Sequence, residues 1–156
     1  MSDNNLIFVG TYNNFIKEKT SPSDGIYTLS FNNSTGELKI ISSVINKENP
    51  SFLTISKNKK YLFSVGELDD IRNSKISSYK INKSKKCLEF INSASCNGLG
   101  PCHITIDNSG KYIYTANYSG KSVSFLPVSE FGKLFDSPIV MHHGKGSNVN
   151  KSRQTD

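Results

Sequence analysis

The chain has 156 residues, the length of one ordinary domain, and carries a formal net charge of +6. Its nine Phe and seven Tyr, together with many Ile and Val, favour strands over helices. The lysines are scattered over turn-like segments and form no basic stripe interleaved with aromatic residues, which argues against a nucleic-acid partner.

Cysteine usage and the N-terminal sequence exclude further classes of protein. Cys87, Cys96 and Cys102 form no CxxC pair and are odd in number, which argues against a disulfide scaffold or a zinc site. The N-terminus has no basic segment followed by a long apolar run, and no apolar segment approaches membrane-spanning length. We therefore expect a cytoplasmic protein without a membrane partner.

The predicted elements are short strands separated by turn residues. The first candidates lie in residues 6–12 (LIFVGTY) and 25–40 (GIYTLSFNNSTGELKI). The middle of the chain carries four strand signals, FLTIS, YLFSVGEL, KISSYKIN and CLEFINSAS, with Asn, Ser, Lys and Gly in the breaks. Two further strands flank the turn DNSG at residues 107–110. Helical periodicity of useful length is absent, so the sequence predicts an all-β fold.

These strand signals repeat with a period of roughly fifty residues. Residues 49–68 align without a gap on residues 100–119, and residues 25–40 align on residues 75–90. Self-similarity at this period is typical of an array of supersecondary units. With four strand signals in each unit, the repeat predicts the four-stranded antiparallel blades of a β-propeller.

The repeats predict about three blades. Their expected bounds are about 5–48 for blade 1, 49–98 for blade 2 and 99–144 for blade 3, with 145–156 starting the connection to a fourth blade. Blade 1 is expected to lack its innermost strand, because it begins at what is the second strand elsewhere. An unclosed arc exposes apolar faces and strand edges. We therefore expect the N-terminal part of a longer protein, in which further blades or another chain close the ring.

The repeats disagree at strand ends, where a functional site is expected. His103 stands in place of Phe52, and Asn117 and Tyr118 stand in place of a Gly-Glu pair that ends in Glu67. Strand ends on a rigid scaffold can present side chains to a ligand. Each position also has a purely structural interpretation. The histidine would secure a strand end, the glutamate would be a solvated strand terminus, and the Asn-Tyr pair would form a turn.

Alternation along the strands limits which neighbours act together. Cys102 and His103 should face opposite ways, so they are not expected to form a thiolate–imidazole dyad. His142 and His143, which precede a Gly-rich loop, should also face opposite ways, so at most one of them would contribute to a site. Further metal ligands are missing there, and no metal site is predicted. Arg153 by itself is most simply a surface charge.

Taken in chain order, the segments FVGTY, NPSFLTIS, GPCHITID, TANYSG, HHGKG and RQ resemble those of the lactonase family of seven-bladed propellers. The Pro-Cys-His and Ala-Asn-Tyr-Ser-Gly segments are the most specific, and the resemblance runs over essentially the whole chain. The best-known activity of this family is that of 6-phosphogluconolactonase, while a related member acts as a cyclase on carboxymuconate. The resemblance implies that about three blades of a seven-bladed ring are present.

The resemblance also implies roles for individual residues. Glu67 or His103 would activate a water molecule, and Arg153 would hold a phosphate or the developing oxyanion. The substrate-binding residues would be Asn117, Tyr118, His142 and Gln154. The loop SNVNKS before Arg153 is slightly longer than the family pattern.

The implied function is hydrolysis of 6-phospho-glucono-1,5-lactone to 6-phosphogluconate in the pentose phosphate pathway, by a truncated form of the enzyme. The implied partner is this small phosphorylated sugar lactone, and no metal or organic cofactor is called for. Two alternatives stay open. One is a non-catalytic propeller fragment or interaction piece, and the other is a propeller lactonase or cyclase for another lactone, such as a carboxymuconate lactone. A WD-type interaction propeller is disfavoured because the chain contains no Trp.

Overall fold

The computed structural model describes residues 4–13 and 23–144 of the chain. Over these residues the chain forms strands joined by turns and bends, and none of them lies in a helix. No helix in the described segments is therefore long and apolar enough to cross a membrane. The predicted all-β fold class is confirmed.

The strands form three antiparallel sheets in which neighbours along the chain are also neighbours in the sheet. The first sheet contains β1 (Asn4–Gly10), β2 (Gly25–Asn32) and β3 (Leu38–Ile45). The second contains β4 (Leu53–Ile55), β5 (Tyr61–Val65), β6 (Lys75–Asn82) and β7 (Cys87–Ser95). The third contains β8 (Pro101–Ile106), β9 (Tyr112–Asn117), β10 (Ser122–Pro127) and β11 (Ile139–His142).

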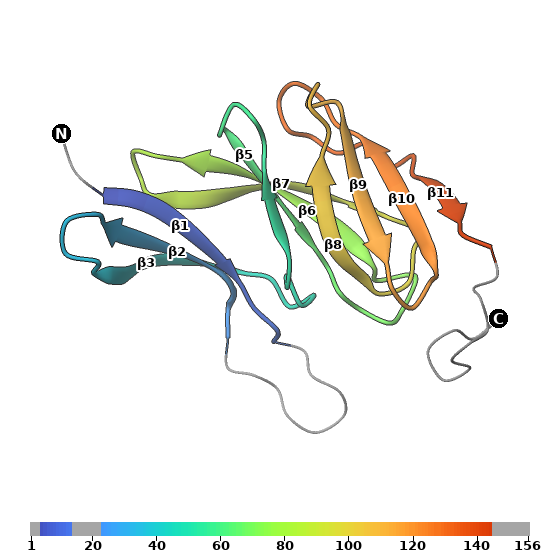
Figure 1. Cartoon of the computed structure of the whole chain (residues 1–156), viewed down its shortest axis with the longest axis horizontal. Coiled ribbons are helices and arrows are strands. Elements are labelled where there is room, and N and C mark those ends of the chain that lie inside the picture. Colours follow the sequence, from blue (N-terminus) through green and yellow to red (C-terminus); the bar gives the residue numbers. More distant parts are fainter. Residues whose placement is uncertain (1–3, 14–22, 145–156) are drawn as a thin grey trace.

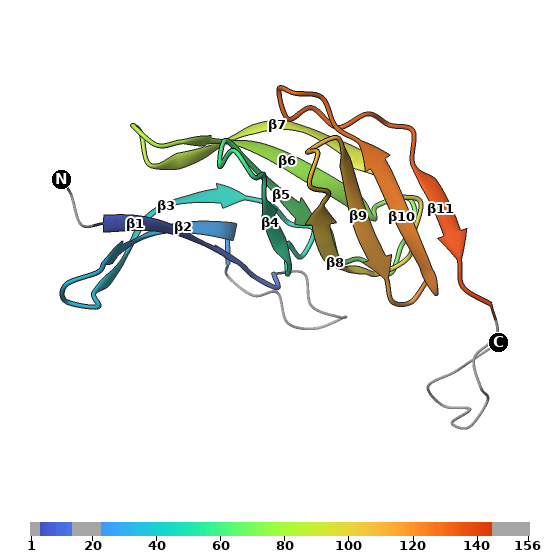
Figure 2. The same ribbon diagram turned by 45° about the horizontal axis from the view of Figure 1, so that its top comes forward.

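The sheets follow one another across the molecule, as Figure 1 and Figure 2 show. β4 and β8, the first strands of the second and third sheets, contact each other, and β1 contacts β4. On the far side of the first two sheets, β3 contacts β7. The sheets therefore pack face to face with their first strands adjacent, which is the arrangement of propeller blades.

The hairpin turns of the second and third sheets have the same geometry, as the sequence repeat requires. The N–H of Lys59 donates to the carbonyl of Ser56 at 2.8 Å, and the N–H of Gly110 donates to the carbonyl of Asp107 at 3.0 Å. Lys59 and Gly110 both have positive φ, 56° and 74°. Glycine adopts this backbone region at no steric cost, whereas lysine adopts it only because the turn demands it.

The carboxylate of Asp107 stabilises the second of these turns. The hydroxyl of Ser109 and the backbone N–H groups of Tyr112, Ser109 and Lys111 donate to it, and together they lower the pKa of Asp107 to about 2. A charged Asp that accepts several N–H bonds of its own turn is a common way to fix a tight reversal. The Asp107 carboxylate thus has a structural role within its own turn.

The core lies between the sheets, and β5 is buried on both of its faces. Leu62 packs with Ile26 and Tyr79 between the first and second sheets. Its neighbour Phe63 packs with residues such as Ile104 between the second and third sheets. Successive side chains of a strand point to opposite faces, so one strand supplies both layers of the core.

A long connection adds a second link between the second and third sheets. Residues 128–134, between β10 and β11, reach over the second sheet. There the carbonyl of Gly132 accepts a hydrogen bond from the buried hydroxyl of Ser78 at 2.6 Å. The side chain of Asn92 bonds the backbone of Leu134 in both directions, at 2.9 and 3.0 Å. These polar contacts fix the register between the two sheets.

We expect the substitution Phe63→Ala to lower the free energy of unfolding by about 3–5 kcal/mol, because the Phe63 ring is fully buried and its removal leaves a cavity. The matched control is Phe131→Ala, since the Phe131 side chain is 71% exposed and its loss should change stability by less than about 0.5 kcal/mol. Urea unfolding of the two variants measures the difference. Equal losses would contradict a core placed between the second and third sheets.

Candidate active site

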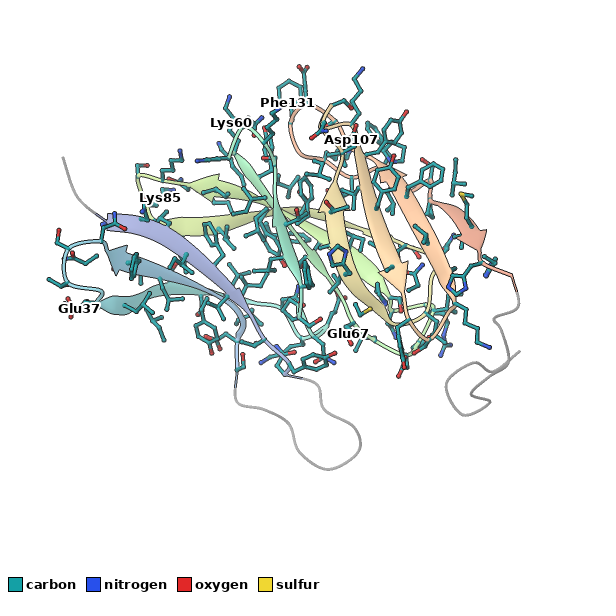
Figure 3. The ribbon with its side chains drawn as sticks, viewed as in Figure 1. Glu37, Lys60, Glu67, Lys85, Asp107 and Phe131 are labelled. Atoms are coloured by element: carbon teal, nitrogen blue, oxygen red, sulfur yellow. The ribbon has the colours of Figure 1, made fainter. Side chains whose placement is uncertain are left out.

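Glu67 follows β5 at the end of the sheets opposite the hairpin turns that carry Lys60 and Asp107 (Figure 3). Three chain segments meet there: the residues after β1, the residues that lead into β4, and the residues after β5. All three are strand ends, and strand ends held by a packed core can present side chains to a ligand.

The repeat explains how these strand ends are formed. Asn49 and Gly100 both precede a proline and both have positive φ, 51° and 61°. The carbonyl of Asn49 accepts from the N–H of Glu67 at 3.1 Å, and the carbonyl of Gly100 accepts from the N–H of Tyr118 at 2.9 Å. Glu67 and Tyr118 therefore occupy equivalent places in the second and third sheets. Asn is one of the few residues besides glycine that tolerates this backbone region.

The carboxylate of Glu67 is half-buried and engaged by two hydroxyl groups. The Ser51 hydroxyl donates to its Oε2, and the Tyr12 hydroxyl donates to the same carboxylate. Partial burial, followed by this hydrogen bond and the negative charge of Glu67, raises the pKa of Tyr12 to about 12. Tyr12 comes from the first sheet and Glu67 from the second, so the cluster lies across the boundary between two sheets.

His103 lies on β8 with its side chain exposed. Its ring packs on that of Phe52, with 4.4 Å between the ring centroids and an angle of 49° between the planes. Phe52 directly follows Ser51 in the chain. Ser51 contacts Glu67 and Phe52 contacts His103, so adjacent residues contact the two candidate site residues. The structure therefore brings these two predicted residues to the same place.

The pairing of β8 with its neighbouring strand is irregular beside His103. The pairing of β8 with β9 shifts register between Pro101 and His103, so Cys102 lies in a β-bulge. The half-buried Cys102 thiol approaches the carbonyl of Ala116 at 3.7 Å. Beyond the bulge the expected alternation holds, with Ile104 buried on one face and His103 exposed on the other.

The Asn117 side chain is 2% exposed and turns into the third sheet. Its amide nitrogen donates to the hydroxyls of Ser122 and Ser124 at 3.0 and 2.7 Å, and its oxygen accepts from Thr115 at 3.2 Å. The next residue, Tyr118, is 78% exposed. Of this predicted substrate-binding pair, one side chain is engaged within the sheet and the other is free to meet a ligand.

His142 is exposed on β11, the strand of the third sheet most distant from β8. Three strand spacings separate it from β8, which corresponds to about 14 Å. The structure thus does not bring His142 to His103 and Glu67. Arg153 and Gln154 lie outside the described residues.

Two residues of the cluster, Tyr12 and Ser51, were not predicted from the sequence. The repeat carried a signal for both. FVGTY aligns on SVGEL, which sets Tyr12 against Leu68, and the alignment of the proline segments sets Ser51 against Cys102. Both are mismatches at strand ends, the same criterion that identified Glu67 and His103.

Other charged groups near Glu67 are engaged with neighbours, since Asp69 accepts from the Ser119 hydroxyl at 2.7 Å and Glu48 pairs with Lys75 at 4.0 Å. Within residues 4–13 and 23–144 the single arginine is Arg72, which is exposed and paired with Asp70 at 3.3 Å. In the same segments, no group of three or more His, Cys, Asp or Glu side chains could hold a metal ion.

Packed antiparallel sheets of three and four strands, with polar side chains gathered at neighbouring strand ends, define a β-propeller with a candidate ligand site. Residues 6–156 match the family model described as lactonase, 7-bladed beta-propeller. The chain belongs to this family, and the recognised resemblance is confirmed.

Relatives and solved structures agree with this assignment. The 6-phosphogluconolactonase of Formosa agariphila is 39% identical over 128 residues, which make up 82% of this chain and 35% of that protein. That of Bacillus subtilis is 30% identical over 141 residues, 89% of this chain and 38% of that protein. The chain therefore spans little more than a third of the length of these relatives.

Among solved structures, one from Bacteroides fragilis, provisionally assigned as a 6-phosphogluconolactonase, superposes with a TM-score of 0.85 at 36% identity. The match covers 98% of this chain and 40% of that one. The periplasmic gluconolactonase of Pseudomonas aeruginosa superposes with a TM-score of 0.74 at 27% identity, covering 91% of this chain and 39% of its own.

We expect Asn117→Ala to lower the free energy of unfolding by about 1–3 kcal/mol, because it leaves the buried hydroxyls of Ser122 and Ser124 without their partner. The matched control is the neighbouring change Tyr118→Ala, which should alter stability by less than about 0.5 kcal/mol because Tyr118 is exposed. Thermal unfolding of both variants measures this. A neutral Asn117→Ala would show that the amide contributes little to the third sheet.

Proposed function

We propose that this chain, within a closed ring, hydrolyses 6-phospho-glucono-1,5-lactone to 6-phosphogluconate, a step of the pentose phosphate pathway. The observation that carries the proposal is the meeting of Glu67 and His103 around the Ser51–Phe52 pair. Support also comes from relatives in this family that are named 6-phosphogluconolactonase. The ring would be completed by further blades or by another chain.

The exposed His103 is the better placed general base. Its imidazole has no hydrogen-bond partner among the described residues, and the Phe52 ring fixes its plane. Imidazole is the side chain that most often takes a proton from water in catalysis. Water would attack the lactone carbonyl and pass a proton to His103. The ring C–O bond would then break, and the departing ring oxygen would take the proton back.

The other predicted residues would bind the substrate. The Glu67 carboxylate can accept hydrogen bonds from sugar hydroxyls, because two hydroxyl donors leave part of its acceptor capacity free. The exposed Tyr118 hydroxyl can orient the ring, and Asn117 would act through the position of Tyr118. Arg153, with Gln154 beside it, would hold the phosphate, because a guanidinium suits bidentate phosphate binding.

A second candidate function is the hydrolysis of an unphosphorylated gluconolactone. The specific observation in its favour is the structural similarity to the periplasmic gluconolactonase of Pseudomonas aeruginosa. For the compartment we propose the cytoplasm, which is supported by the three free cysteines of the described segments.

The test is a hydrolysis assay on the chain itself and on a chimaera in which the chain replaces the segment that it matches in the Formosa agariphila relative. We expect the chimaera to hydrolyse 6-phospho-glucono-1,5-lactone faster than the spontaneous reaction. His103→Ala should then lower kcat by about 10²–10⁴-fold, because a general base contributes that much. Thermal unfolding of each protein controls for folding.

Comparison of substrates decides between the two candidate functions. Faster turnover of the phosphorylated lactone than of glucono-1,5-lactone supports the first, and the reverse order supports the second. A folded chimaera that hydrolyses neither lactone above the spontaneous rate would contradict both candidate functions and favour a non-catalytic propeller piece.

A further inference from the structure

The segment that carries Tyr12 is anchored on both sides of the residue. A Cβ atom on Gly10 would lie 1.9 Å from the carbonyl oxygen of Pro50, so only glycine allows the end of β1 to pass so close. The N–H of Asn13 donates to Asn49 Oδ1 at 3.0 Å, and the N–H of Asn49 donates to Asn13 Oδ1 at 3.3 Å. Both asparagines are buried. Tyr12 is therefore fixed against the residues that lead into β4.

The same residues anchor Glu67. Asn49 binds the backbone of Glu67 twice, because its carbonyl accepts from the Glu67 N–H at 3.1 Å and its side-chain amide donates to the Glu67 carbonyl at 3.2 Å. Two residues later, the Ser51 hydroxyl donates to the carboxylate. Residues 49–51 thus hold the backbone and the side chain of Glu67 together.

We propose that Tyr12 and Ser51 are positioning residues, which fix the carboxylate of Glu67 so that its remaining acceptor positions face the hydroxyl groups of a sugar lactone. For the class of ligand, this inference rests on the proposed function. A carboxylate has about four acceptor positions, of which the two hydroxyls occupy only part. A side chain held in one orientation before the ligand arrives loses less conformational entropy when it binds.

This arrangement makes the site depend on the packing of neighbouring sheets. Tyr12 belongs to the first sheet, and Ser51 and Glu67 belong to the second. The acceptor group of the site is therefore positioned by residues that flank strands of two neighbouring sheets.

The first experiment tests the contact in the chain itself and needs no activity. Tyrosine labelled with ¹³C at Cζ reports the titration of each phenol by NMR, and Tyr12→Phe assigns the Tyr12 signal. We expect Glu67→Gln to lower the pKa of Tyr12 from about 12 toward its ordinary value of 10.0, because the carboxylate charge is removed. The control Glu37→Gln changes an exposed turn residue and should leave the titration unchanged. An unchanged Tyr12 titration in Glu67→Gln overturns the inference.

The second experiment measures the effect on the substrate in the chimaera. We expect Tyr12→Phe and Ser51→Ala each to raise KM about tenfold or more with a smaller change in kcat, because each removes a hydrogen bond to a charged group that binds substrate. Ser51→Thr should restore KM, and Tyr114→Phe, which alters a tyrosine on the surface of β9, should leave it unchanged. In a Glu67→Gln background the Tyr12→Phe change should add nothing.

The outcomes separate this inference from the proposed function. A loss of kcat with an unchanged KM, or full additivity of Tyr12→Phe and Glu67→Gln, overturns the positioning role. An inactive but folded chimaera that keeps the Tyr12 titration shift overturns the proposed function alone. In that case the Kd for gluconate is measured by calorimetry in place of KM. If Tyr12→Phe leaves this Kd unchanged, the inference is overturned as well.

Discussion

The structure depends on the burial of the second sheet on both faces. β5 has no solvent side, since Leu62 packs toward the first sheet and Phe63 toward the third. A strand of this kind gains apolar burial only when a sheet covers each face. The requirement for neighbours on both sides aligns the three sheets and brings strand ends from neighbouring sheets together. The candidate site lies at those ends as a consequence of the packing.

Repetition supplies the scaffold of the site, and departures from repetition supply its chemistry. Asn49 and Gly100 make the same backbone reversal, so Glu67 and Tyr118 are presented in the same way by two sheets. Because the backbone is constant, a change of one side chain can place a different functional group at the same position. A propeller can thus acquire a site without altering its fold.

The fold was predictable from the sequence because the period of fifty residues and the turn residues act locally. The same comparison of repeats found Glu67 and His103, which the structure places around one residue pair. It did not predict that the amide of Asn117 donates hydrogen bonds to Ser122 and Ser124, because these contacts are made across strands. Nor does any repeat reveal that Tyr12 donates to Glu67, since that hydrogen bond joins two sheets.

The connection of residues 128–134 has a consequence for how this architecture can change in evolution. It leaves the third sheet and binds Ser78 and Asn92 of the second, so its partners belong to the preceding unit. Exchange or duplication of a unit cut at the sheet boundary would strand a buried hydroxyl and an amide without partners, at a cost of about 1–3 kcal/mol each. The third sheet therefore depends on the sheet before it for part of its polar packing, and a unit moved alone would need matching partners at its new boundary.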